Sequence, residues 1–341
     1  MDKNKIIGYG ELMLRLTPLE DETLIEQSEG LKMGFAGAEA NILIDLALLG
    51  HQASFVSAFP KNPIGRAAEQ FLQKHGVGTR SITWDQNRLG TYFIEHGTSF
   101  RATRVTYDRA DSSLSKTVFR AAEWEKAFSG ATYFILTGIT PALSEICQKN
   151  IEMALEVAKK KNVKIVFDMN FRRSLWSSAD ALKIYESILS KVDIVFGNLG
   201  AVTDVFGMDS SPLNDFEALQ QATEHAATQL NNKGDFEYLA MTMRFQKSAT
   251  NNILGGMIMQ GDKSYFSRAI PTEIVDRLGG GDAFAAAALH GIIHNWSANA
   301  SVDFATTAFA VTQTLKGDIN YITEEEMLDM ASGNLQGHVK R

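Results

Sequence analysis

The chain has 341 residues, of which 45% are hydrophobic and 21% charged, so it can bury a large core without a disulfide or metal staple. Its 33 Lys and Arg against 40 Asp and Glu give a net charge of −7, which argues against a nucleic-acid partner bound by bulk positive charge. Cys147 is the single cysteine, which excludes an internal disulfide and any Cys-x-x-Cys site. The start of the sequence lacks the apolar segment of a signal peptide, and no apolar run reaches the ~18 residues of a membrane span, so we expect a cytoplasmic protein without a membrane partner.

The first quarter of the chain alternates between strand and helix patterns. Gly8-Tyr9-Gly10 has the spacing that begins a dinucleotide-binding G-x-G-x-x-G motif. The third glycine position holds Met13 and no helix pattern follows, so we reject a dinucleotide site there. A second Gly/Ala-rich loop leads into a helix that carries Glu39 and Asn41, polar groups that need either a ligand or a backbone partner there. We expect strands at 5–11, 13–18 and 54–58, and helices at 34–50 and 64–75.

The stretch 90–115 has a different character. Two segments of mixed polarity, 91–95 and 104–108, are joined by His96-Gly97-Thr98-Ser99, which predicts a hairpin with one solvated face. Such a hairpin does not belong in a buried parallel sheet, so we expect it to join the strand near Met13 in a small projecting sheet.

The alternating rhythm resumes after Thr132 and continues to the end of the chain. Polar side chains follow several predicted strands, and the carboxyl ends of parallel strands are where open α/β sheets bind ligands. These strand ends carry Asp168, Asn198 and Arg244. We expect strands at 133–136, 164–168, 191–196 and 237–242, a hairpin at 255–260 and 264–267, and helices at 144–161, 283–293, 303–316 and 324–331.

Three consecutive glycines, Gly279, Gly280 and Gly281, precede Asp282 and an Ala-rich apolar helix. Glycines at a helix start let backbone N–H groups approach an anion, and the helix N-terminus favours negative charge. An anion cradle beside a carboxylate suits phosphoryl transfer to a hydroxyl, because the amides stabilise the phosphate and the carboxylate accepts the proton. The plainer alternative is a glycine-bounded helix with Asp282 as its N-cap.

Other common chemistries lack their motifs. The sequence has no G-x-x-x-x-G-K-[ST], no H-E-x-x-H and no G-x-S-x-G. The seven histidines are scattered along the chain, so we expect structural roles for them and predict no metal-ligating residue.

Two segments resemble a known family, the ribokinase-like (PfkB-type) sugar kinases. The run from Asp276 to Asp282 resembles the family's D-T-x-G-A-G-D signature, and the run from Gly37 to Asn41 resembles its G-G-x-x-x-N segment. The resemblance extends over essentially the whole chain. It implies an α/β fold, a ribokinase-like three-layer sandwich with a mostly parallel central sheet and a small β-sheet lid. It also implies a single domain over 1–341, with lid strands from about 12–35 and 90–112.

Segments at 10–18, 37–39, 107–113 and 168–176 are similar to 2-keto-3-deoxygluconate kinases, which phosphorylate the C6 hydroxyl of a sugar acid with ATP and Mg²⁺. The resemblance implies that Asp282 is the catalytic base and that Gly279, Gly280 and Gly281 form the anion hole. A base at a helix N-terminus is expected to have a depressed pKa. The substrate contacts implied are Gly37, Asn41, Tyr92, Tyr107, Arg109 and Arg172, and the nucleotide contacts are Asn198, Thr242, Arg244, Gly279 and Gly281. Guanidinium groups suit a sugar carboxylate, which supports Arg109 and Arg172 independently.

The chain departs from the family pattern at several positions. Arg277 replaces a Thr, Ala201 replaces the Glu of a magnesium-linked motif, Arg244 replaces a Gly of the nucleotide segment, and Ala36 replaces a Gly. A kinase for a neutral sugar such as fructose or ribose therefore stays open, as does a non-catalytic sugar- or nucleotide-binding regulator. Lid sheets of this family often pair, which makes a homodimer through the lid a further expectation.

Overall fold

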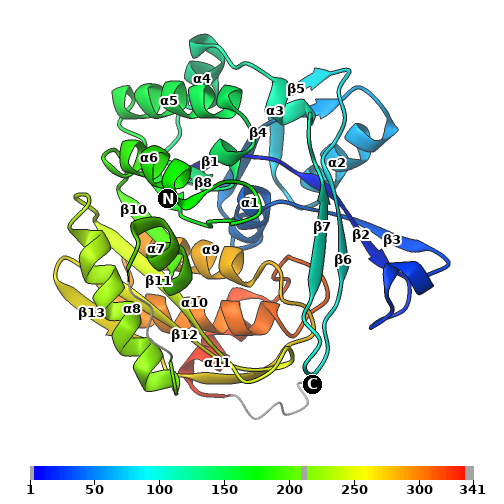
Figure 1. Cartoon of the computed structure of the whole chain (residues 1–341). Helices are drawn as coiled ribbons and strands as arrows, with labels where there is room; N and C mark the ends of the chain where they lie inside the picture. Colours follow the sequence, from blue (N-terminus) through cyan, green and yellow to red (C-terminus); the bar gives the residue numbers. More distant parts are fainter. Residues whose placement is uncertain (1–3, 209–212, 335–341) are drawn as a thin grey trace.

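The computed structural model describes residues 4–208 and 213–334 (Figure 1). Its centre is a ten-stranded sheet in the order β13-β12-β11-β10-β9-β8-β1-β4-β5, with β14 paired to β12. Neighbouring strands from β11 to β5 pair in parallel, while β12 pairs antiparallel with β11, β13 and β14. The strands are β1 (Lys5–Tyr9), β4 (Gln52–Pro60), β5 (Gly78–Asp85), β8 (Tyr133–Thr137), β9 (Lys164–Asp168), β10 (Ile194–Asn198), β11 (Tyr238–Gln246), β12 (Asn251–Gln260), β13 (Lys263–Phe266) and β14 (Ile270–Glu273).

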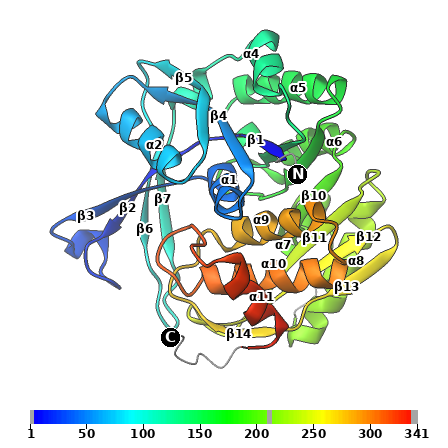
Figure 2. The ribbon, with the colours of Figure 1, turned by 180° about the vertical axis from the view of Figure 1, so that it is seen from behind.

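Helices cover both faces of this sheet and bury a separate apolar core on each. Adjacent strand residues alternate between the two cores, as Ile6 and Ile7 of β1 do. One face, seen in Figure 2, carries α1 (Ala38–Leu48), α2 (Pro63–Lys74), α9 (Gly280–Ile293), α10 (Ala298–Thr312) and α11 (Glu324–Ser332). The other face carries α3 (Ser113–Lys116), α4 (Ala121–Ala127), α5 (Glu145–Lys160), α6 (Ser178–Leu189), α7 (Leu199–Phe206) and α8 (Phe216–Asn231). Short 3₁₀ turns lie at Ile25–Gln27 and Thr140–Ala142. The predicted α/β sandwich is confirmed.

A second sheet of four strands stands beside the body (Figures 1 and 2). Its order is β3-β2-β6-β7, with β2 (Met13–Pro18), β3 (Leu31–Ala36), β6 (Thr91–Glu95) and β7 (Arg104–Asp108). Met13, Ala36, Tyr92 and Ile94 form its small apolar core, against which Leu278 of the glycine-rich stretch packs. The predicted small sheet is therefore confirmed, and we call it the lid sheet.

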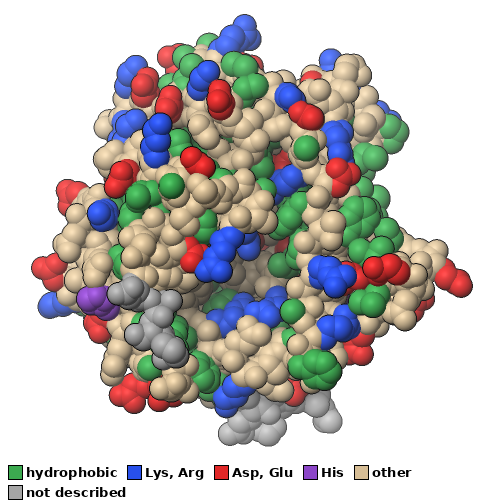
Figure 3. Space-filling view, viewed as in Figure 1, with side chains coloured by type: hydrophobic (Ala, Val, Ile, Leu, Met, Phe, Trp, Pro, Cys, Tyr) green, Lys and Arg blue, Asp and Glu red, His purple; other side chains and the backbone are tan. Residues whose placement is uncertain are grey.

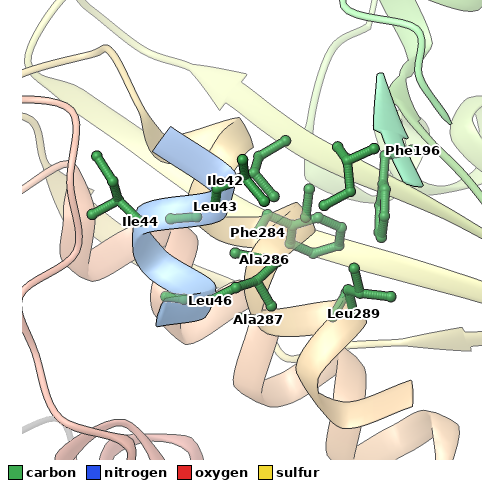
Figure 4. Close-up of a cluster of buried hydrophobic side chains, with 14 of the residues drawn as sticks. Ile42, Leu43, Ile44, Leu46, Phe196, Phe284, Ala286, Ala287 and Leu289 are labelled. Atoms are coloured by element: carbon green, nitrogen blue, oxygen red, sulfur yellow. The ribbon is translucent and has the colours of Figure 1, made fainter. Parts of the chain in front are cut away.

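Close packing of small side chains holds helix α9 in place. Its Ala-rich run is buried throughout, and the small side chains let α1 and α10 approach closely. Figure 4 shows side chains of α1 facing those of α9, with Phe196 of β10 beside them. Fully burying one large apolar side chain stabilises the fold by about 1.5–3 kcal/mol. This packing fixes the start of α9 near the carboxyl edge of the sheet.

Several expectations from the sequence need correction. Strands β5 and β14 and helices α3, α4, α6, α7 and α8 were not predicted. The helix predicted at 303–316 instead begins at Ala298 and ends at Thr312. Its start is fixed by Ser297, whose hydroxyl accepts a hydrogen bond from the Ala300 amide at 3.2 Å.

Candidate active site

The glycine-rich loop turns into α9 through three glycines with different surroundings. Gly279 has φ of +74°, and a Cβ there would overlap the carbonyl oxygen of Asp318, so the position requires glycine. A Cβ on Gly280 would crowd the side chains of Phe309 and Gln313. Gly281 is the opposite case, because a Cβ there would meet no described heavy atom within 4 Å. Gly281 therefore borders open space, at a helix start whose first N–H groups have no partner within the helix.

Asp282 lies in the first turn of α9 with only 8% of its surface exposed. Its Oδ2 accepts a hydrogen bond from Asn41 Nδ2 at 2.7 Å, and the Asn41 Oδ1 accepts one from the Gly37 amide at 3.3 Å. The capping alternative is wrong, because Gly279 is the N-cap and no side chain caps this helix. The depressed pKa predicted for Asp282 is also wrong. Burial raises its pKa well above 3.8, with a further increase from the nearby carboxylate of Asp168.

A cavity of about 600 Å³ opens at the carboxyl ends of β9, β10 and β11, beside the start of α9. Asn198 and Thr242 are paired residues on adjacent strands, and Asp168 lies opposite Phe196 on the next strand. Gly279, Gly281 and Asp282 complete this part of the wall. The strand ends and the glycine-rich loop, far apart in sequence, thus meet around one cavity, as the parallel topology predicts.

Four arginines line the cavity: Arg172, Arg173, Arg244 and Arg277. Figure 3 shows Lys and Arg side chains on both sides of a central hollow. Arg244 packs its guanidinium carbon 5.4 Å from the Phe309 ring centroid, and its Nη1 is buried without a hydrogen-bond partner among the described residues. Burial, together with the neighbouring Arg277, lowers the pKa of Arg244 to about 10. A buried cation with an unused donor fits an anionic ligand.

The remaining predicted residues lie on or beside the lid sheet. Tyr92 is buried, Tyr107 is 37% exposed, and their ring centroids are 6.0 Å apart across β6 and β7. Arg109 stacks on Tyr107 at 5.5 Å and donates a hydrogen bond from Nε to Glu11 Oε2 at 2.8 Å. Its Nη2 forms an ion pair with the same oxygen at 2.6 Å. Among the described residues, the cavity lining includes none of these lid side chains. The predicted site is therefore divided between the body and the lid.

The comparisons with known proteins agree with this geometry. The model of the pfkB family of carbohydrate kinases matches residues 3–325. The chain belongs to this family. It is therefore a carbohydrate kinase, a phosphotransferase built on a ribokinase-like fold.

Individual relatives cover nearly the whole kinase. A 2-dehydro-3-deoxygalactonokinase from Haloferax volcanii is 31% identical over 335 residues, which span 98% of each chain. A crystal structure of 2-dehydro-3-deoxygluconokinase from Thermotoga maritima has a TM-score of 0.91 at 35% identity and covers 97% of this chain and 100% of that one. A putative 2-keto-3-deoxygluconate kinase from Enterococcus faecalis has a TM-score of 0.85 at 29% identity, with 99% of each chain covered.

Two of the polar residues singled out in the sequence serve the protein's own structure. Asn198 is the N-cap of α7, and its Oδ1 accepts a hydrogen bond from the Ala201 amide at 2.9 Å. Glu39 is buried, and one of its oxygens accepts hydrogen bonds from the hydroxyls of Thr137 and Thr140 at 2.8 and 2.7 Å. Of the two partners expected for Glu39, a ligand or the backbone, the structure supplies the backbone amide of Thr137 at 3.2 Å, together with these two hydroxyls.

Gly37 permits a close approach within the body. A Cβ on Gly37 would overlap the carbonyl oxygen of Glu11, so glycine lets the start of α1 lie against that segment. Glu11 itself was missed from the sequence. The available signal was a lone carboxylate beside the apolar run Leu12-Met13-Leu14. In the structure it is 4% exposed, and such a buried group needs a partner, here Arg109.

A buried ion-pair network, which no sequence pattern indicates, joins the lid sheet to the glycine-rich loop. Arg15 of β2 pairs with both Asp276 and Asp318. Asp276 also accepts hydrogen bonds from the Leu278 and Gly317 amides at 3.2 and 3.1 Å. The first Asp of the family signature thus anchors the loop on three sides.

Three of the scattered histidines meet at the other end of α9. One ring nitrogen from each of His51, His290 and His294 lies within 4.8 Å of the other two. Burial, with the two neighbouring rings, lowers the pKa of His51 to about 4, so this ring is neutral at physiological pH.

Among the described helices, none has the length and apolar character needed to cross a membrane.

Proposed function

We propose that this carbohydrate kinase transfers a phosphoryl group from ATP to the C6 hydroxyl of 2-keto-3-deoxygluconate. The observation that carries the proposal is the buried carboxylate of Asp282 at a glycine-lined helix start, next to a cavity lined by four arginines. A carboxylate whose pKa is raised is a stronger proton acceptor once ionised, which suits the removal of a hydroxyl proton. The intact glycine-rich loop argues against the alternative of a non-catalytic regulator.

The nucleotide belongs in the cavity. The unused donor of Arg244 and the open space beside Gly281 fit phosphate oxygens, which accept hydrogen bonds from guanidinium and backbone N–H groups. Asn198 and Thr242 line the same wall and are proposed to contact the nucleotide. Mg²⁺ neutralises phosphate charge when it is bound. Because Ala201 brings no carboxylate, we infer that the cation is held mainly through phosphate oxygens and water.

The sugar acid is proposed to bind between the cavity and the lid sheet. Arg172 is exposed at the rim of the cavity, where it can pair with the substrate carboxylate. Arg109 already pairs with Glu11, so its contribution to an acidic substrate would be shared with that carboxylate. Tyr92 and Tyr107 on the lid, and Gly37 and Asn41 beside Asp282, are the other proposed contacts. Closure of the lid would exclude water, the competing phosphoryl acceptor.

The experiment is ATP turnover by the purified protein with Mg²⁺ and a panel of sugars. The panel contains 2-keto-3-deoxygluconate, its galactonate epimer, fructose, ribose and no sugar. We expect turnover with the gluconate compound to exceed turnover with either neutral sugar. The epimer is included because one relative carries the name of a 2-dehydro-3-deoxygalactonokinase. Preference for a neutral sugar would overturn the proposed substrate, and no turnover with any sugar of the panel would overturn the proposed reaction.

A matched pair of variants tests the acidic substrate directly. Arg172→Ala should raise the KM for the sugar acid about 10- to 100-fold, the equivalent of about 1.5–3 kcal/mol for a charged hydrogen bond. The control is Arg104→Ala on the outer lid strand, where the side chain is 66% exposed. Equal KM values in the two variants would remove Arg172 from the site.

We also propose that a second copy of the chain covers the outer face of the lid sheet. Strand β3 is an edge strand, and Leu31 and Met33, two residues apart on one of its faces, are 38% and 59% exposed. Leu19, whose amide donates to the Gly30 carbonyl just before this strand, is 59% exposed. Met33→Asp should convert a dimer into monomers in sedimentation experiments. Leu328→Asp on α11 is the control, because Leu328 is 43% exposed on a different surface. A wild-type chain that sediments as a monomer would contradict this proposal.

A further inference from the structure

Three imidazole rings converge at the C-terminal end of α9, outside the cavity. His290 lies in the last turn of α9, and His294, four residues later, is the C-cap of this helix, so the two rings come to the same side. His51 comes from the turn between α1 and β4, and its Nε2 lies 2.9 Å from His290 Nδ1. The three rings present one nitrogen each within 4.8 Å of one another. This spacing brings three imidazole nitrogens to one point.

Hydrogen bonds outside the cluster fix which nitrogen each helical histidine presents. The Nδ1 of His294 lies 2.9 Å from the carbonyl oxygen of His290, so it carries the proton and donates, which leaves Nε2 as the free electron-pair donor. The Nε2 of His290 lies 3.3 Å from Glu324 Oε1 and donates to it, which leaves Nδ1 facing His51. A carboxylate and a backbone carbonyl behind the ligand rings are the partners that orient metal-bound histidines.

We propose that His51, His290 and His294 form a binding site for a divalent transition metal of the Zn²⁺ type. The ligands are His51 Nε2, His290 Nδ1 and His294 Nε2, with water at the fourth position. Imidazole nitrogens suit zinc, and three protein ligands with one open position is an established tetrahedral arrangement. Without metal, the His51–His290 contact is an ordinary hydrogen bond, and metal binding replaces it after the His51 proton moves to Nδ1.

The surroundings of the cluster favour a cation. The C-terminal end of a helix carries partial negative charge, and the Glu324 carboxylate adds to it. His294 is exposed, so an ion can enter from solvent. His290 follows Asp282 by eight positions, about 12 Å along the helix axis at 1.5 Å per residue. The site is therefore separate from the proposed phosphoryl-transfer centre, and it does not depend on the proposed substrate.

The experiment is Zn²⁺ binding to the full chain without an affinity tag, after chelator treatment and without nucleotide. We expect one Zn²⁺ per chain by equilibrium dialysis, and the visible absorption of tetrahedral Co²⁺ when that ion is used as the probe. His294→Gln and His51→Gln should each weaken Zn²⁺ binding at least tenfold. Glu324→Gln should weaken it about tenfold, because it removes the group that orients His290.

The control is His225→Gln, which alters an exposed histidine on α8. It should bind Zn²⁺ like the wild type. Because His294 is exposed, the metal-free His294→Gln variant should unfold at the wild-type midpoint, which separates ligand loss from misfolding. Zn²⁺ should raise the unfolding midpoint of the wild type and leave that of the His51→Gln/His294→Gln double variant unchanged. Zn²⁺ affinity that is equal in His294→Gln and His225→Gln, or the absence of stoichiometric binding, would overturn the site.

Discussion

The two ends of helix α9 present opposite chemistry on one buried scaffold. At the N-terminal end, Gly281 and Asp282 lie together in the sequence and border an open, arginine-lined cavity. At the C-terminal end, His290 and His294 meet His51, which is more than two hundred positions away. The helix dipole favours anions at the first end and cations at the second. A site made of residues that are contiguous in the chain can therefore be predicted from the sequence. A site whose residues come from distant segments cannot be predicted in this way.

The largest effect should come from the carboxylate at the N-terminal end. Asp282→Asn keeps the side-chain volume and removes the proton acceptor, so kcat should fall by about 10²–10⁴-fold. ATP binding, measured by calorimetry, should stay close to that of the wild type. Steady-state kinetics with the sugar acid is the measurement. Near-normal kcat in this variant would assign the proton transfer to another group and weaken the contrast between the two ends.

The next largest effect should come from the buried ion-pair network that joins the lid sheet to the glycine-rich loop. Arg15→Met leaves Asp276 and Asp318 buried without their guanidinium partner, which should cost about 3–5 kcal/mol in the free energy of unfolding. The matched control is Lys316→Met. Lys316 pairs with Asp21 at the surface, so its loss should cost at most about 1 kcal/mol.

Urea unfolding measures both variants. An Arg15→Met/Asp318→Asn double variant should recover part of the lost stability, because it removes one of the two uncompensated charges. Equal stability of Arg15→Met and Lys316→Met would show that the buried bridge contributes no more than a surface pair. The anchoring of the glycine-rich loop would then rest on the hydrogen bonds that Asp276 accepts from the Leu278 and Gly317 amides.

The glycines themselves sharpen the contrast between structural and functional positions. Gly279→Ala should destabilise the fold by about 1–3 kcal/mol, since alanine is strained at positive φ and its methyl group would overlap Asp318. Gly281→Ala should leave stability within about 1 kcal/mol, because its methyl group enters open space. Its turnover should nevertheless fall about tenfold or more, as the methyl group would stand where phosphate is proposed to bind. Thermal unfolding and kinetics on both variants measure this difference, and loss of stability in Gly281→Ala with unchanged turnover would contradict it.

Much of the fold and part of the site could be read from the sequence, for identifiable reasons. The strand ends at Asp168 and Asn198 were predicted to converge because parallel strands carry their carboxyl ends to one edge. The Glu11–Arg109 pair and the histidine cluster were not predicted, because contacts between distant segments leave no periodic signal along the chain. Helices α6 and α8 were missed as well, although serine and aspartate caps mark their starts.

The pKa of Asp282 was predicted in the wrong direction because two opposing effects act on it. Its position at a helix start favours the ionised form and was visible in the sequence. Its burial and the nearby Asp168 carboxylate favour the protonated form, and both depend on the fold. Burial raises the pKa of Asp168 itself to about 6. The three-dimensional surroundings of Asp168 and Asp282 therefore decide the protonation of these two carboxylates.

The smallest effect, and the most direct test of this electrostatic difference, is the pH dependence of stability. The pKa of Asp282 is raised in the folded state above its ordinary value of 3.8, so the folded protein binds this proton more tightly than the unfolded chain. Its stabilising contribution is therefore fully present below 3.8 and is lost as the pH rises through the folded-state pKa. Asp282→Asn removes that loss, so the variant should gain stability relative to the wild type as the pH rises. Urea unfolding across the pH range measures the gain. A stability gain that grows toward acidic pH would show that Asp282 is stabilised as the anion. A gain that grows toward alkaline pH, as expected, would mean that the kinase keeps a destabilising charge at the position where its proposed chemistry requires one.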